Sequence, residues 1–478
     1  MREDEIISSG KGCLEEPEEK AYLDAVKGLD AKIVVLDDDP TGIQTVHGIY
    51  VYTDWDLETI RKGFDGDEKV FYVLTNSRSM GEEESVRIHR EIAYHVAAVS
   101  KETGKDFLLV SRGDSTLRGH YPAETAALKE ELEQQGFRTD GEILCPFFLE
   151  GGRFTIGDIH YVRGADGTLT PAGETEFAGD ATFGYRSSDI KDWVEEKTHG
   201  AVKREEIQSI TVEELRERRI DEIIRKLMDV NAFGKIIVNA ACYGDLKVFA
   251  TVFARAVSQG KRFMLRTAAS AVRVLGGIPE KPLLTREELG VEDRGTGGLI
   301  VVGSHVNKTT RQLKALETYP GISFLEFHVG MAADKTAFLK EQKRVRKLCA
   351  ELLEEGKTVA VYTSRERIEA GKADREENLR LSVQISDAVT QIVSTLPVIP
   401  KYLVAKGGIT SSDIGTKALK VKRAYVPGQI LPGIPVWMPG SESRFPGIPY
   451  VVFPGNVGAD TDLLRVVSIL EGRQGGVV

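Results

Sequence analysis

The sequence lacks the features of membrane and secreted proteins. Its apolar runs stay well short of the roughly 18 residues of a membrane-spanning helix, and its first residues, MREDEIISSGKGC, have neither the basic start nor the apolar stretch of a signal peptide. The four cysteines, Cys13, Cys145, Cys242 and Cys349, form no CxxC pair, which disfavours a zinc site and a disulfide framework. We therefore expect a soluble, cytoplasmic protein with reduced thiols.

Signatures of several functional classes are also missing. No GxGxxG motif opens the first strand–helix unit, which counts against a Rossmann dehydrogenase, and the eight histidines show no HxxxH or HExxH spacing for zinc. The stretch GSHVNKT resembles a P-loop, but Lys308 stands where that motif needs its second glycine, and the spacing is one residue short. With 63 Lys and Arg against 73 Asp and Glu, the net charge of -10 disfavours a nucleic-acid partner.

What the sequence does contain is an alternation of strand and helix patterns. β-Branched runs recur at 32–36, 48–52, 70–74, 107–111 and 235–239, and most are continuous, as in parallel strands that are covered on both faces. Between them lie helical patterns such as 80–102, for which Ser79 and Glu82 predict a capping box at the start. Residues 211–227 predict one amphipathic helix. This alternation predicts an α/β fold.

The length of 478 residues is enough for two or three domains. Residues 278–298 interrupt the pattern with Pro, Gly and charges, and a second α/β series follows at 298–302, 358–362, 401–405 and 450–453. We predict two α/β domains with mostly parallel sheets, residues 1–290 and 291–478, with the active site in the cleft between them.

Ligands of such sheets bind beyond the carboxyl ends of the strands. In the first domain these loops read DDDPTG, TNSRSM, SRGDSTLRGHYPAE and CPFFLEGGRFTIGD. They carry three kinds of polar side chain: the carboxylates Asp38, Asp39 and Asp114, the guanidiniums Arg78, Arg112, Arg118 and Arg153, and the hydroxyls Thr41, Ser77, Ser115 and Thr116. Because arginine forks bind anions while carboxylates and hydroxyls suit a polyol, we predict a site for a small, anionic, hydroxyl-bearing molecule.

Individual roles in this site are less determined. Asp38 or Asp39 could act as general base toward a substrate hydroxyl. His120, His160 and His305 could line a pocket or simply pack, and we assign Asp180 to a solvated surface.

The second domain has glycine-rich loops after its strands, VVGSHVNKTTRQ, VAKGGITSSDIG and VFPGNVGADT. Such loops present backbone N–H groups to phosphates, especially where a helix begins behind them. Three of them in one domain predict a nucleotide site.

Seven motifs, in order along nearly all of the chain, resemble those of the four-carbon acid sugar kinase family. They are DDDPTG, TNSRSM, DSTLRGH and CPFFLEGGR in the first half, and GSHVNKTTRQ, KGGITSSDIG and PGNVGADTDLL in the second. The resemblance implies ATP-dependent phosphorylation of a small aldonic acid such as threonate, erythronate or a 3-oxo-tetronate, with Mg²⁺. It also implies that the acid is held by the first domain and ATP by the second.

The resemblance further implies which residues make contacts. The ATP contacts would be Ser304, Gly407, Gly408, Ile409, Thr410 and Gly455, and the acid contacts Asp38, Thr41, Gly42, Arg78, Asp114, Ser115 and Arg118. The chain departs from the family pattern at four positions: Thr45 and Asn76 replace aspartates, Arg112 replaces a lysine, and Ile409 replaces a glutamate. We expect these changes to alter which acid is accepted.

The mechanism that follows is a hypothesis. Arg118 and Arg78 would clamp the carboxylate of the acid, Asp38 and Asp114 its hydroxyls, while Arg112 and Mg²⁺ stabilise the transferred phosphoryl group. Closure about the segment near residue 290 would exclude water. The expected partners are small molecules, without nucleic acid or membrane, and homo-oligomerisation stays open. Two alternatives remain: another sugar-acid enzyme, such as a dehydrogenase or aldolase, and a non-catalytic sensor of sugar acid and nucleotide.

Overall fold

The chain folds into two compact units. The computed structural model describes residues 14–164, 166–365, 375–455 and 457–472. The first unit spans Met1–Ile49 and Asp54–Glu280, and the second spans Tyr50–Thr53 and Lys281–Val478. None of the helices in the described part of the chain combines the length and apolar character that crossing a bilayer demands.

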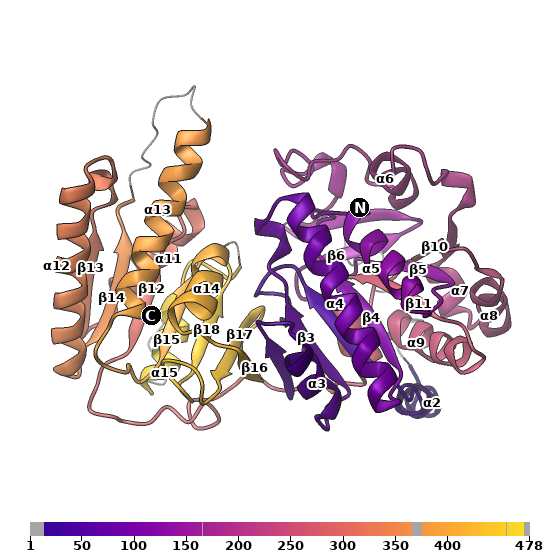
Figure 1. The fold of residues 1–478 in the computed structure, drawn as a ribbon, viewed down its shortest axis with the longest axis horizontal. Helices are drawn as coiled ribbons and strands as arrows, with labels where there is room; N and C mark the ends of the chain where they lie inside the picture. The colour runs from indigo at the N-terminus through magenta and orange to yellow at the C-terminus, as the bar shows by residue number, and fades with distance from the viewer. Residues whose placement is uncertain (1–13, 165, 366–374, 456, 473–478) are drawn as a thin grey trace. The chain divides into compact units, whose positions relative to one another are not determined.

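A parallel sheet forms the centre of the first unit (Figure 1). Its order is β3-β1-β4-β11-β5-β10-β9, and every neighbouring pair is parallel. The strands are β1 (Lys32–Asp37), β3 (Val70–Leu74), β4 (Phe107–Arg112), β5 (Gly141–Cys145), β9 (Gln208–Ile210), β10 (Gly234–Val238) and β11 (Phe263–Thr267). Residues of β3, β4 and β5 are buried throughout, which explains why these strands have continuous rather than alternating hydrophobic sequences.

Two groups of helices accompany this sheet. One comprises α3 (Leu57–Asp65), α4 (Glu82–Thr103) and α5 (Ala123–Gln134), which pack against one another; the other comprises α2 (Glu16–Lys27), α7 (Val212–Arg216), α8 (Ile220–Asp229), α9 (Tyr243–Ser258) and α10 (Ala269–Leu275), packed around α9. A small antiparallel sheet, β6 (Arg153–Ile156), β7 (Ile159–Arg163) and β8 (Leu169–Pro171), follows β5, and α6 (Ile190–Lys197) comes after it. The small sheet carries Arg153, one of the predicted site residues.

The second unit has a mixed sheet. The parallel strands β13 (Ile322–Phe327), β14 (Thr358–Thr363), β12 (Leu299–Val302), β15 (Leu403–Lys406) and β18 (Tyr450–Phe453) follow one another in that order. The antiparallel hairpin of β17 (Ile434–Pro439) and β16 (Arg423–Leu431) extends the sheet beyond β18, and β2 (Ile49–Tyr52) lies next to β16. A short segment of the N-terminal half thus completes the second unit.

Helices cover both faces of this second sheet. One face carries α11 (Asn307–Leu316) and α15 (Asp462–Glu471), whose leucines and valines join the main core of the unit. Against β13 and β14 packs α12 (Lys335–Glu354), which in turn contacts α13 (Arg375–Ser394), and α13 contacts α14 (Gly408–Asp413). The structure therefore has the two mostly parallel α/β domains that the sequence predicts.

Two local predictions are wrong. Helix α4 has Gly81 as its N-cap, because Ser79 belongs to a 3-10 turn (Ser77–Ser79) in which its hydroxyl donates to the carbonyl of Asn76. The single helix predicted over 211–227 is divided into α7 and α8. It breaks at Arg218, which has a left-handed φ of 57° and whose guanidinium donates to the carbonyls of Leu215 and Arg216.

Candidate functional site

The polar loops of the first unit follow strands that end next to one another in the sheet. In the strand register, Asp37 at the end of β1 is the partner of Leu74 on β3 and of Arg112 on β4, and Arg112 is also the partner of Thr267 on β11. Because parallel strands end at the same edge of the sheet, the loops behind them gather there. The predicted acid-site residues of these loops are thereby brought together.

Asp37 is the most deeply buried of the three adjacent aspartates. It is 1% exposed, and Oδ1 lies 3.4 Å from Nη1 of Arg112. Burial raises the pKa of Asp37 well above its usual value, and Arg112 opposes that shift only in part. A Cβ at Gly42 would overlap the Asp37 carboxylate, so the turn after β1 needs glycine at this position.

The next two aspartates differ in their main partners, although Arg78 also lies 3.9 Å from Asp39. Asp38 accepts a bidentate pair from Arg78, with Nε 3.1 Å from Oδ2 and Nη2 2.6 Å from Oδ1, and Arg112 lies 3.8 Å away. Asp39 instead accepts from the backbone N–H and the hydroxyl of Thr41, at 2.8 and 2.5 Å. The run of three carboxylates is stable because Arg78 and Arg112 neutralise part of its charge and the turn at Thr41 donates hydrogen bonds to the last carboxylate.

Asp114, in the loop after β4, extends the network. It accepts from Nε of Arg118 at 2.7 Å and from the hydroxyl of Thr116, and its other oxygen lies 3.6 Å from Arg78. Burial acts to raise the pKa of Asp114, but Arg78 and Arg118 outweigh it and hold that pKa well below its usual range. Arg118 also lies 3.5 Å from Asp180. Asp180, which we assigned to a solvated surface, keeps a side chain that is 27% exposed, but it also takes part in the arginine network.

His160 has a packing role beside Ser115. Its Nε2 lies 2.8 Å from the carbonyl of Ser115 and its Nδ1 3.0 Å from the hydroxyl of Thr155. Burial lowers the pKa of His160 to about 4. The imidazole is therefore neutral at physiological pH and fixes the loop that carries Ser115.

Arg266 is a central residue that sequence reasoning missed. This buried side chain of β11 donates to the hydroxyl of Ser111 at 3.2 Å and lies 3.7 Å from Glu124. A Cβ at Gly113 would overlap its guanidinium, and Gly119 has a φ of 125° beside it. Arg266 thus supports both ends of the loop 113–119. The strand FMLRT was not recognised in the sequence, so Arg266 could not be placed at the end of a strand.

The glycine-rich loops of the second unit also come together. A Cβ at Gly303 would overlap the hydroxyl of Thr410. Thr309, in the first turn of α11, donates to the hydroxyl of Ser304 at 3.2 Å and to the carbonyl of Gly455 at 3.4 Å. The residues implied as ATP contacts therefore surround the ends of β12, β15 and β18.

Lys406 joins two of these loops and was not singled out from the sequence. It ends β15, is 0% exposed, and donates to the carbonyls of Pro454 and Gly455, the latter at 3.0 Å. Burial, assisted by repulsion from Lys308, lowers the pKa of Lys406 to about 7. Lys406 directly precedes the paired glycines of KGGITSSDIG, which is the signal that could have identified it.

A cavity of about 360 Å³ lies beside these loops. Its wall combines the loop residues with α13: Gly303, Ser304, His305, Val306, Thr363, Ile385, Ser386, Val389, Thr390, Gly407, Gly408, Ile409 and Thr410. Val306, Ile385 and Val389 give it an apolar part, whereas Ile409 is 68% exposed at its rim. The apolar part of this cavity suits the flat base of a nucleotide. The glycine-rich loops beside it suit the phosphates, because they present backbone N–H groups.

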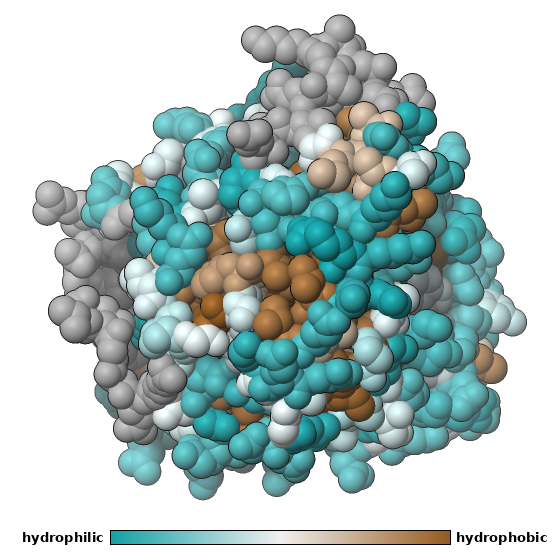
Figure 2. Space-filling model, turned by 90° about the vertical axis from the view of Figure 1, so that its left-hand side faces the viewer, coloured by the Kyte–Doolittle hydropathy of each residue, from teal (hydrophilic) through white to brown (hydrophobic). Residues whose placement is uncertain are grey.

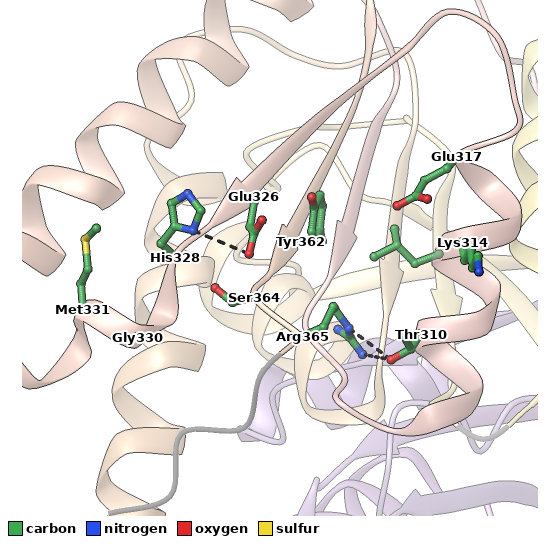
Figure 3. Close-up of a pocket in the computed structure, with 11 residues that line it drawn as sticks. Thr310, Lys314, Glu317, Glu326, His328, Gly330, Met331, Tyr362, Ser364 and Arg365 are labelled. Atoms are coloured by element: carbon green, nitrogen blue, oxygen red, sulfur yellow. Dashed lines mark hydrogen bonds and ion pairs between the residues drawn. The ribbon is translucent and has the colours of Figure 1, made fainter.

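A larger cavity of about 740 Å³ lies over β13, β14 and α11 (Figure 3). Both signs of charge line it, with Lys314 and Arg365 on the positive side and Glu317 and Glu326 on the negative side, and His328 lies 3.6 Å from Glu326. Arg365 donates to Thr310 and, at 2.8 Å, to the carbonyl of Ser304, so it links this cavity to the first glycine loop. Figure 2, which views the β13 side of Figure 1, shows an apolar area surrounded by polar side chains.

Two of the residues that depart from the family pattern form hydrogen bonds within the first unit. The hydroxyl of Thr45 is buried and donates to the carbonyl of Ala269 at 2.9 Å. Asn76 has a left-handed φ of 55°, and its amide donates to Ser79. Asparagine tolerates this backbone conformation better than most residues do.

The described residues include no group of three or more His, Cys, Asp or Glu side chains arranged for a metal. Mg²⁺ keeps several waters and is commonly bound through phosphates with one or two carboxylates. A Mg²⁺ ion bound in that way would not need such a group of protein side chains. Cys145, Cys242 and Cys349 are thiols, and Cys13 lies outside the described residues.

Comparison with protein families defines the class. Residues 33–275 match a sugar-binding N-terminal domain, and residues 299–463 match a nucleotide-binding C-terminal domain. The fold and the two groups of loops agree with a protein that binds a sugar-type ligand and a nucleotide. The chain belongs to the four-carbon acid sugar kinase family, which was earlier known as DUF1537.

Solved structures share the fold. A protein of Salmonella typhimurium LT2 aligns over 91% of this chain and 98% of its own, with 14% identity and a TM-score of 0.65. Haemophilus influenzae protein HI1011, of the DUF1537 family, aligns over 91% and 100%, with 16% identity and a TM-score of 0.60. Among curated proteins, none matches the chain in sequence.

Proposed function

We propose that the protein is an ATP-dependent kinase that phosphorylates a hydroxyl of a small, four-carbon sugar acid. The observation that carries the proposal is that one chain joins a sugar-binding and a nucleotide-binding domain, each with polar loops at the carboxyl ends of parallel strands. A kinase needs these two ligands and no further redox group.

In this proposal the phosphates of ATP lie against the loops of Ser304, Gly407 and Gly455, and the base enters the cavity lined by Ile385 and Val389. Mg²⁺ bound to the phosphates neutralises their charge. The acid lies in the network of Asp38, Asp39 and Asp114 with their arginines.

The chemistry assigned to the chain is positioning and proton transfer. Asp38, held by Arg78, accepts the proton of the terminal hydroxyl as that hydroxyl attacks the γ-phosphoryl group. Arg112, whose Nε is buried without a partner in the described part of the chain, supplies positive charge beside Asp38. Asp39 is the candidate base that ranks second to Asp38, because Thr41 already donates two hydrogen bonds to one of its carboxylate oxygens.

The test is ADP release from Mg·ATP over a panel of four- to six-carbon aldonic and oxo-aldonic acids, with mass detection of the product. We expect acid-dependent ADP release and a product that is heavier by one phosphoryl group. Folded protein that binds ATP yet releases no ADP with any acid would contradict the proposal and favour the non-catalytic sensor.

A further inference from the structure

Three of the four arginines in the acid site already have carboxylate partners. Arg78 forms the bidentate pair with Asp38, and Arg118 pairs with Asp114 and Asp180. The third, Arg112, lies 3.4 Å from Asp37 and 3.8 Å from Asp38. An incoming carboxylate would have to compete with these internal carboxylates for the same donors.

Arg153 differs from the other three. It begins β6, and its backbone N–H and carbonyl are both bonded to Phe148, so its position is fixed. Its guanidinium lies 5.6 Å from the centre of the Phe177 ring, and Arg118 lies 5.1 Å from the same ring. Arg153 therefore adjoins the acid site through a shared aromatic contact.

The donors of Arg153 are mostly unused. One Nη1 group donates to the carbonyl of Gly151, Nε is buried without a hydrogen-bond partner, and no carboxylate of the described residues lies within ion-pair distance. Burial lowers the pKa of Arg153; the Asp114 carboxylate opposes that shift, and the positive charges of Arg118 and Arg163 act in the same sense as burial. A largely buried guanidinium that has no carboxylate in direct contact is unfavourable, and a directly bound anion would reduce that penalty.

We infer that Arg153 is the residue that binds the carboxylate of the acid substrate. The planar fork of arginine matches a carboxylate in two parallel hydrogen bonds. Arg78 and Arg118 then have a different role from the one the sequence predicts: they position Asp38 and Asp114 for the hydroxyls. The inference rests on the proposed function, because it assumes that the ligand is an acid.

Substitution of Arg153 tests this inference. The dissociation constants of L-threonate and D-erythronate, and of the matching alditols threitol and erythritol, are measured by calorimetry for the wild type, Arg153→Gln and Arg153→Lys. For Arg153→Gln we expect acid binding to weaken about tenfold to a hundredfold, with little change for the alditols, so the preference for acids is lost. Arg153→Lys should recover part of it, because lysine keeps the charge but not the fork.

Arg163→Gln is the matched control. Arg163 lies on the paired strand β7 and stacks on Phe154, and its removal takes away the same charge close by. We expect this variant to bind acids as the wild type does. An equal loss for acids and alditols in Arg153→Gln would indicate only packing on Phe177 and would overturn the inference. So would unchanged acid binding in both Arg153 variants, or a loss of the same size in Arg163→Gln.

The experiment separates the two proposals. Acid binding by the wild type that depends on Arg153, without ADP release, would overturn the kinase and retain the carboxylate site. ADP release with an acid whose KM is unaffected in Arg153→Gln would overturn the carboxylate site and retain the kinase. Wild-type protein that binds neither acid would overturn the inference itself.

Discussion

Asp38 is the residue on which the proposed chemistry depends most. Asp38→Asn keeps the size of the side chain but removes the base, and it weakens the pair with Arg78. We expect kcat for acid-dependent ADP release to fall about a hundredfold to ten-thousandfold, the usual contribution of a general base. Steady-state kinetics at saturating acid and ATP measure this.

The matched variant is Asp180→Asn, which removes a carboxylate at the other end of the arginine network. It should change KM for the acid more than kcat. An unchanged kcat in Asp38→Asn would exclude Asp38 as the base, and Asp39→Asn would be the next variant.

Gly113 and Arg266 form a pair that can be tested together. Because a Cβ at Gly113 overlaps the Arg266 guanidinium, Gly113→Ala should lower the free energy of unfolding by about 1–3 kcal/mol. In an Arg266→Ala background the same glycine substitution should lower it by less, since the guanidinium is gone. Urea unfolding of the wild type, the two single variants and the double variant gives the coupling energy. Additive effects would mean that the stability of the loop 113–119 does not depend on the contact between Gly113 and Arg266.

At the level of elements, Lys406 couples strand β15 to the loop after β18. Its pKa is about 7 in the folded protein and about 10.4 in an unfolded chain. Between these values the unfolded state binds more protons, so the free energy of unfolding should rise with pH from about 7 upward. Over the whole range between the two pKa values, the free energy of unfolding should rise by about 5 kcal/mol.

The difference between the wild type and Lys406→Met isolates this contribution. Stability measured by urea unfolding from pH 6.5 to 9 should rise less steeply in Lys406→Met. Lys347→Met, which changes an exposed lysine of α12, should keep the slope of the wild type. Parallel slopes for all three proteins would show that Lys406 does not titrate in this range.

The elements also show where sequence patterns stop being sufficient. Continuous β-branched runs predicted β1, β3, β4, β10, β12, β14, β15 and β18, because buried parallel strands need apolar residues on both faces. The break between α7 and α8 was not predictable from periodicity. It depends on the guanidinium of Arg218, which also pairs with Glu18, 200 residues earlier in the chain.

At the scale of the whole molecule, the residues assigned to the two ligands belong to different units. Gly407→Ala places a Cβ on a residue with a φ of 127°, 3.1 Å from Ser304. It should weaken ATP binding at least tenfold and leave acid binding unchanged. Asp114→Asn should do the opposite, because effects at independent sites stay separate.

Calorimetric titration of each ligand alone measures both effects. Loss of acid binding in Gly407→Ala, in protein with a wild-type melting temperature, would mean that the two sites are coupled before both ligands are present.

The sequence by itself determined the α/β class, the two series of strands and the loops that carry polar or glycine-rich residues. These are properties of local periodicity and of the order of motifs, so they can be recognised along the chain. Tertiary structure alone decided which donors are occupied. Arg78, Arg112, Arg118 and Arg153 are equivalent in the sequence, but only Arg153 has no carboxylate among the described residues within ion-pair distance. Pairing depends on distances between loops of different strands, and burial decides how strongly an unpaired charge attracts a ligand.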